Sequence, residues 1–319
     1  MNYQTEFKIL AASLCLAFPL GAQQPTPANT TTKPVPSYFR ADHERAVKGD
    51  VEAMLEENKK YQEAGLPKPH ADQTVVSKLE KLAKAGDIRA QRRMLLFREE
   101  SGLDPMPRPP EREAQLRSLT KRLADSGDPE GMVAWADVLE RDGLIKKNWN
   151  EQEISHWFYK SWDYYEAKAK QGDVKAMVTL VETLAPAIPS LMASDIGNRR
   201  MYWREQAALH GDPASMFVMG MEFWGKANPK TGLSPECEAW FLKSAKAGYW
   251  RAMLTLAGAY AHGSFQILNG EAPRPNPAKA WEWVDRAVAV TGNPQIWKAF
   301  VNEDDEDFME GFPPRPGSK

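Results

Sequence analysis

Between residues 39 and 301 the chain repeats one pattern of apolar and polar positions. Apolar residues recur every three or four positions, as they do on the buried face of an amphipathic helix. The pattern then stops at a short break in which Ala, two further residues, Gly and usually Asp follow one another, and a second helical pattern starts at once. Seven such breaks occur, and their glycines are Gly49, Gly86, Gly127, Gly172, Gly211, Gly248 and Gly292.

The residue types in the break are those that join two helices without a loop. A glycine just past a helix end adopts the left-handed conformation at no steric cost and closes the last turn. The next residue is Asp in five copies and Asn in one, and both residues cap the N-terminus of a helix. A small residue follows three positions later and lets neighbouring helices approach closely; these residues are Ala53, Ala90, Gly131, Ala176, Ser215 and Ala252.

The breaks return at a nearly constant period. Consecutive glycines are 37, 41, 45, 39, 37 and 44 residues apart. A period near forty with two helices in each unit is typical of a solenoid, in which each helix pair buries its apolar face against the next pair. Aromatic residues keep the same phase eight or nine positions before the glycine, and we expect them in the core: Tyr164, Trp203, Trp240 and Trp283.

This pattern resembles the Sel1-like repeats, which are relatives of the tetratricopeptide repeats. The best copies are AWFLKSAKAGYWRAMLTLAGAYAHG (239–263) and YWREQAALHGDPASMFVMGMEFWG (202–225). The resemblance implies an all-α, right-handed superhelical solenoid of about seven helix-turn-helix repeats that binds protein rather than catalysing a reaction. Two features depart from the pattern: the segments 100–111 and 185–198 are longer than it needs, and the cysteine pairs of the family's disulfide-rich secreted branch are absent.

The N-terminus predicts an exported protein. Residues 9–20 form an apolar run of the length found in signal peptides, and we expect a signal peptide over 1–22 followed by a Pro/Thr-rich linker over 23–38. Cys15 lacks the small preceding residue that a lipoprotein would need, and cleavage there would divide the apolar run. We therefore expect a periplasmic protein, with the solenoid over 39–301 and an acidic, flexible tail over 302–319.

The net charge argues against nucleic-acid binding, and the search for motifs argues against catalysis. The formal net charge is −2, so no overall field attracts nucleic acid. The sequence has no nucleophile elbow, no phosphate-binding glycine loop and no paired metal-ligand motif. Cys237, inside an expected helix without a phased His partner, is predicted to be buried and inert. We expect no catalytic residue, cofactor or metal.

Aromatic residues outside the phased positions are candidates for contact with a partner protein. In HWFYKSWDYY (156–165) we expect Tyr164 in the core, and Tyr159 and Trp162 on an exposed face, although extra core packing would also explain them. Tyr249 and Trp250 replace the usual Asp and its neighbour after Gly248, so something other than capping is favoured there. Trp224, beside a loop, is a further candidate.

The tail EDDEDFMEGF offers a second kind of contact. It is either a solvated end or an acidic segment in which Asp304 and Asp305 steer association with a basic cleft while Phe308 and Phe312 anchor it.

Three hypotheses of function follow. An exported Sel1-like array without disulfides resembles the periplasmic immunity proteins that neutralise phospholipase toxins of the type VI secretion system. The alternative is a periplasmic scaffold or adaptor for envelope or polysaccharide-secretion machinery. A cell-wall-active or drug-hydrolysing enzyme is the third, and no residue pattern supports it. We expect a monomer, without an integral membrane segment in the mature chain, whose partner is a protein.

Overall fold

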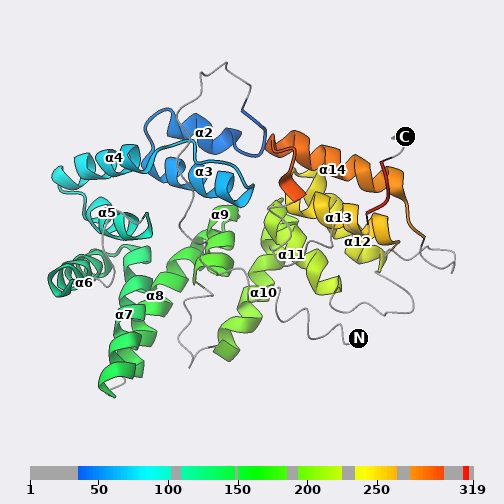
Figure 1. Ribbon diagram of the computed structural model, residues 1–319. Coiled ribbons are helices and arrows are strands. Elements are labelled where there is room, and N and C mark those ends of the chain that lie inside the picture. The colour runs from blue at the N-terminus through cyan, green and yellow to red at the C-terminus, as the bar shows by residue number, and fades with distance from the viewer. Residues whose placement is uncertain are drawn as a thin grey trace. The chain divides into compact units, whose positions relative to one another are not determined.

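The computed structural model describes residues 35–101, 109–147, 150–184, 193–224, 234–263, 274–297 and 312–315. Within these ranges the secondary structure is helical and contains no strand (Figure 1). No helix in them is both long and apolar enough to cross a bilayer. The predicted signal peptide, most of the linker, the bulk of the tail and Asp304, Asp305 and Phe308 lie outside the described residues.

The helices come in consecutive pairs, each divided by one of the predicted glycines. Each helix packs on its partner and on the next helix along the chain, so the fold is an all-α solenoid of helix pairs, as predicted. The pairs are α2 (Arg40–Ala46) with α3 (Val51–Glu63), α4 (Asp72–Lys84) with α5 (Ile88–Glu100), α6 (Pro110–Asp125) with α7 (Pro129–Lys146), α8 (Glu151–Ala169) with α9 (Val174–Val178) and its π-helical continuation η2 (Thr179–Leu184), α10 (Ala193–Leu209) with α11 (Pro213–Trp224), and α12 (Pro235–Lys246) with α13 (Trp250–His262). The seventh unit begins with α14 (Pro277–Thr291).

The joints have the predicted chemistry. All seven glycines have positive φ angles, from 72° at Gly292 to 102° at Gly211. Each of the five aspartates accepts a hydrogen bond from the backbone N–H three residues later, at 2.7 to 3.1 Å; the aspartates are Asp50, Asp87, Asp128, Asp173 and Asp212. The residue directly after the glycine thus caps the next helix, which is why two helices can follow each other so closely.

The small residue after each joint is buried against the preceding helix. At Gly131 an added Cβ would lie 2.5 Å from Leu123 Cβ and 2.8 Å from the backbone nitrogen of Ala124. Both neighbouring atoms belong to the backbone of α6 or are attached directly to it, so neither can rotate away. The close approach of α6 and α7 therefore requires glycine at this position.

Gly131→Ala is expected to lower the free energy of unfolding by about 1–3 kcal/mol, because forced overpacking outweighs the better helix propensity of alanine. Gly197→Ala on α10 is the matched control, since among the described residues no atom outside the backbone of α10 lies within 4 Å of the position that a Cβ would take there. That change is expected to stabilise the protein by about 0.5–1 kcal/mol. Urea denaturation measures both, and equal effects of the two substitutions would contradict the close contact.

The last unit contacts the first, which the sequence did not predict. Phe39, directly before α2, is fully buried in the same cluster as Trp250 of α13 and Trp283 of α14. The backbone N–H of Tyr38 donates to the carbonyl of Val290 at 3.4 Å. Figure 1 shows the segment just before α2 next to one end of α14. The N-terminal segment therefore completes the core of the C-terminal helices.

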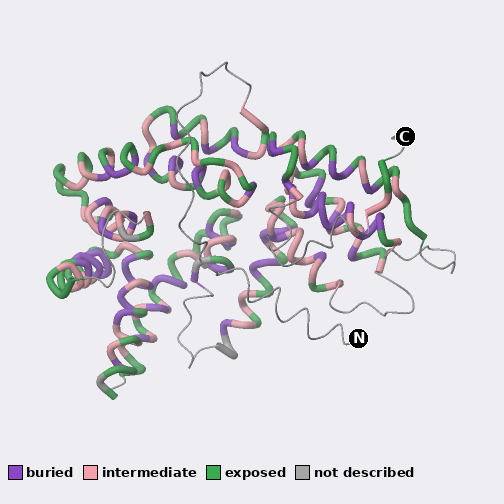
Figure 2. The backbone as a smooth tube through the Cα atoms, viewed as in Figure 1, coloured by how far each residue is buried: buried purple, intermediate pink, exposed green. Residues whose placement is uncertain are grey.

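This contact explains two details of the C-terminal units. Ten of the thirteen residues of α13 are buried, and Figure 2 shows this concentration of buried residues. At the seventh joint Asn293 replaces Asp; its Oδ1 accepts from the N–H of Gln295 at 2.9 Å, as a cap would, while its Nδ2 donates to the carbonyl of Ala64 at 2.7 Å. An aspartate could make the first bond but not the second.

Asn293→Asp is expected to destabilise the protein by about 2–3 kcal/mol, because it removes a buried donor and places a carboxylate against the Ala64 carbonyl. Asp87→Asn is the converse control at an ordinary joint, where both side chains cap equally well, and should change stability by no more than about 0.5 kcal/mol. Thermal unfolding of the two variants decides the matter. If Asn293→Asp is as mild as the control, the bond across the first and last units is absent.

Candidate binding surface

The aromatic helix α8 is rotated from the predicted position. Trp162 is fully buried, whereas Tyr164, expected in the core, is 43% exposed, and Tyr159 is half-buried. The buried stripe of α8 runs through Ile154, Phe158 and Trp162 at a four-residue spacing, which leaves Tyr164 on the opposite side. The expectation that Trp162 faces a partner is therefore wrong. Trp203 and Trp283 are buried as expected, and Trp240 is half-buried beneath the ammonium of Lys243.

A carboxylate explains why Trp162 points inward. Glu166 Oε1 accepts hydrogen bonds from Arg199 at 2.8 Å and from the indole nitrogens of Trp203 and Trp162 at 3.3 and 3.4 Å. Lys170 donates to its other oxygen at 2.9 Å. Burial alone would raise the pKa of Glu166, but these donors outweigh it and lower the pKa to about 2. The cluster ties α8 to α10.

Glu166→Gln is expected to lower the free energy of unfolding at pH 7 by about 1–3 kcal/mol, because charge-assisted hydrogen bonds are lost. Since the pKa of Glu166 is lower in the folded than in the unfolded chain, its contribution is present above about pH 5 and is lost as the pH falls toward 2. The variant should therefore lose stability less steeply than wild type between those values. Asp163→Asn, an exposed change on the same helix, controls for net charge. Parallel pH profiles for wild type and Glu166→Gln would contradict the assignment.

The aromatic pair after Gly248, Tyr249 and Trp250, packs within the chain and does not form a partner-facing surface. Trp250 is fully buried, and Tyr249 is half-buried against the ring of Phe217, with 5.4 Å between centroids. Tyr38 of the N-terminal segment lies beside Trp250, so the aromatic residues at this joint pack where the first unit meets the last. The expectation that Trp250 contacts a partner is wrong, and the missing cap of α13 is explained by packing.

The two remaining aromatic candidates are also engaged within the chain. Trp224 is half-buried, with its ring 5.8 Å from that of Phe241. Phe312 is half-buried and its ring meets that of Trp281 at 5.2 Å in an edge-to-face arrangement. Residue Cys237 is buried, and burial raises the pKa of its thiol to about 12, which fits the predicted inert thiol.

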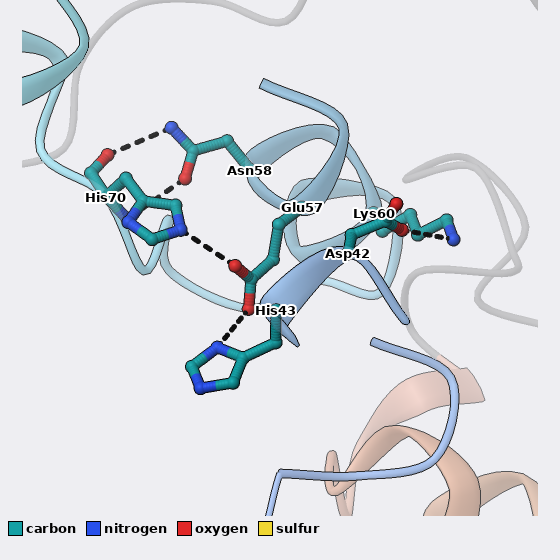
Figure 3. Close-up of polar contacts among 6 residues, drawn as sticks. All are labelled: Asp42, His43, Glu57, Asn58, Lys60 and His70. Carbon is teal, nitrogen blue, oxygen red and sulfur yellow. Dashed lines mark hydrogen bonds and ion pairs between the residues drawn. The ribbon is translucent and has the colours of Figure 1, made fainter. Parts of the chain in front are cut away.

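Sequence reasoning missed a polar cluster centred on Glu57, shown in Figure 3. The carboxylate is fully buried on α3, with His43 Nδ1 of α2 at 2.9 Å from one oxygen and His70 Nε2 at 2.7 Å from the other. Asn58 holds His70 in place through two bonds to its backbone, at 2.9 and 3.0 Å. Next to it, Asp42 and Lys60 form an ion pair at 2.6 Å.

This cluster acts as a polar tie between α2, α3 and the segment that carries His70. Both carboxylate oxygens of Glu57 are engaged, as a buried charge requires, and no group of His, Cys, Asp and Glu among the described residues is arranged to hold a metal ion. One feature of the sequence could have revealed the Glu57 cluster. Glu57 and Asn58 share the buried face of α3 with Ala53 and Met54, and a carboxylate on a buried face requires partners.

Side chains from three successive joints and from α8 interact electrostatically, and we name this set the joint surface. It is formed by Glu52, Arg89, Asp128 and Glu130 at the N-terminal ends of α3, α5 and α7, together with Tyr165 of α8. Arg89 Nε donates to Asp128 Oδ2 at 3.1 Å, from one repeat to the next, while Asp128 Oδ1 caps its own helix at 2.8 Å. The hydrogen bond with Asp128 raises the pKa of Arg89.

The joint surface is accessible to solvent but crowded. Glu52 is exposed, yet desolvation by the surrounding helix ends raises its pKa, and Arg93, Glu130 and Arg89 are its electrostatic neighbours. Burial also raises the pKa of Tyr165 to about 12, with Glu130 and Asp128 adding to the effect. Charged groups of both signs beside an aromatic residue are suited to contact with a polar protein surface.

Comparisons with known proteins add little to this geometry. No protein-family model and no curated protein matches the chain. A Sel1 repeat protein from Oxalobacter formigenes is 24% identical over 81% of this chain and 67% of its own, with a TM-score of 0.37. A protective antigen of uropathogenic Escherichia coli strains that displays an SLR fold is 19% identical over 86% of this chain, with a TM-score of 0.37. This chain spans only 56% of that antigen. The helix-pair architecture therefore rests on the contacts described above.

Proposed function

We propose that the chain is an exported, Sel1-like repeat protein that binds another protein through the joint surface. The observation that carries this proposal is the continuity of Glu52, Arg89 and Glu130 across three repeats, with charges that alternate in sign from one repeat to the next. Alternating charges give specificity because a mismatched partner brings like charges together. The apolar run at residues 9–20 supports export.

We further propose that the protein acts as a monomer. A solenoid normally exposes the apolar face of its terminal repeats unless special capping units cover them. Here Phe39 fills the core of the C-terminal helices, so the first and last units cover each other. This mutual covering removes the usual reason for a repeat array to associate with a second copy.

A narrower proposal concerns the partner. Export, the absence of disulfide-forming pairs and the resemblance to immunity proteins favour a phospholipase toxin of a type VI secretion system, neutralised in the periplasm. Trp162 and Trp250 have no part in this proposal because they are buried. The contacts are instead assigned to the joint surface, which includes Arg89 and Tyr165. An envelope scaffold is the alternative.

The full-length chain should be co-expressed with the product of the adjacent gene directed to the periplasm, and both co-purification and survival recorded. The proposal expects a one-to-one complex and protection from killing. Glu130→Lys and Tyr165→Ala should each weaken the complex at least tenfold, whereas the matched changes Glu151→Lys and Tyr164→Ala, at exposed positions of α8, should not. If the two proteins form no complex and the cells gain no protection, the immunity role is rejected and the scaffold is favoured.

A further inference from the structure

The described C-terminal segment, Phe312–Arg315, lies against one tryptophan of α14. Trp281 Nε1 donates a hydrogen bond to the carbonyl of Pro313 at 2.9 Å. The Phe312 ring meets the same indole edge-on at 5.2 Å and 81°, and the Arg315 guanidinium lies 5.1 Å from its centroid. Arg315 also forms an ion pair with Asp285, one turn further along the helix. A four-residue segment is thus held by contacts at three of its residues.

The sequence of this segment favours the extended conformation that such contacts need. Residues 312–316 are Phe-Pro-Pro-Arg-Pro. Proline fixes its own φ near −65° and biases the residue before it toward extended backbone, so Phe312 and Arg315 are both held extended. The polyproline II conformation has no internal hydrogen bonds, so the proline carbonyls of such a segment accept bonds from outside it. Segments of this kind adopt the polyproline II conformation and are bound by exposed aromatic residues.

Trp281 and Asp285 supply complementary groups at the spacing of one helical turn. The indole N–H binds a proline carbonyl, its ring receives an aromatic side chain and a cation, and the carboxylate of Asp285 fixes the position of the arginine. Trp281 is half-buried, so its orientation is held by the core, whereas Asp285 is exposed and open to a partner. The pair therefore recognises an order: aromatic residue, proline, then arginine.

The bound segment belongs to the same chain, so its concentration at the site is set by the tether. A tethered segment is present at an effective concentration of the order of millimolar, so it occupies its site even when its own affinity is low. Its ion pair is solvent-exposed on both sides, and pairs of this kind contribute little. A segment from another protein with the same chemistry can therefore compete for the site.

We propose that Trp281 and Asp285 form a recognition site for an extended proline–arginine segment of a partner protein, and that Phe312–Arg315 is its intramolecular competitor. This site lies on α14 and is separate from the joint surface, so either proposal can fail without the other. A partner engages it when its segment displaces the chain's own.

The test uses the full-length protein and a fluorescein-labelled peptide of residues 311–319, GFPPRPGSK, with binding followed by anisotropy. In the double variant Phe312→Ala/Arg315→Ala the competitor is weakened while Trp281 and Asp285 are intact. The peptide should bind this variant at least tenfold more tightly than wild type. Equal binding to both proteins would overturn the proposal.

A charge exchange then tests the contact itself. Adding Asp285→Arg to the double variant should reduce peptide binding at least tenfold, and a peptide with glutamate in place of its arginine should restore it. Glu282→Arg, an equal change of charge at a neighbouring exposed position, should leave binding of the original peptide within twofold. Failure of the exchanged peptide to recover binding would overturn the assignment of Asp285.

Discussion

The burial of Phe39 among the C-terminal helices is the contact on which the rest of the arrangement depends. In an open solenoid each repeat touches only its neighbours, and its ends are free to move apart. Here Phe39 shares one buried cluster with Trp250 and Trp283, and Asn293 bonds to the carbonyl of Ala64. Every repeat between these residues must therefore have a curvature that lets the two ends meet, and the stability of either end includes that of the other.

Three carboxylates, one of them buried and two half-buried, are best understood within this constraint. Glu57 binds His43 and His70, and thereby fixes the short helix α2, which begins directly after Phe39. Glu166 performs a similar task between α8 and α10, and Asp128 between α5 and α7. In each case both carboxylate oxygens accept hydrogen bonds, and at least one of these bonds comes from a neighbouring helix or segment. Apolar packing alone would let these elements shift relative to one another. Such ties favour a single arrangement of the repeats, which a binding surface shared by several repeats needs.

The sequence predicted the local elements well because their chemistry is local. The joints, the Asp caps and the small residues each depend on positions within a few residues of one another, and they recur where expected. Predictions about side-chain exposure were weaker. The rotation of α8, which buries Trp162 and exposes Tyr164, depends on donors from α10 that lie 33 or more residues away. The closing contact between Phe39 and α13 depends on the summed curvature of all repeats, which no single segment encodes.

Hydrogen exchange of the variant Phe39→Leu tests the central claim most directly. The account predicts that amides of α13 and α14, more than two hundred residues away in sequence, lose protection together with those of α2 and α3, while α6 and α7 are unchanged. Phe158→Leu, an equal change in the core around α8, should leave α13 and α14 protected. If Phe39→Leu alters only the exchange of α2, α3 and α4, the first and last units do not stabilise each other and the account is wrong.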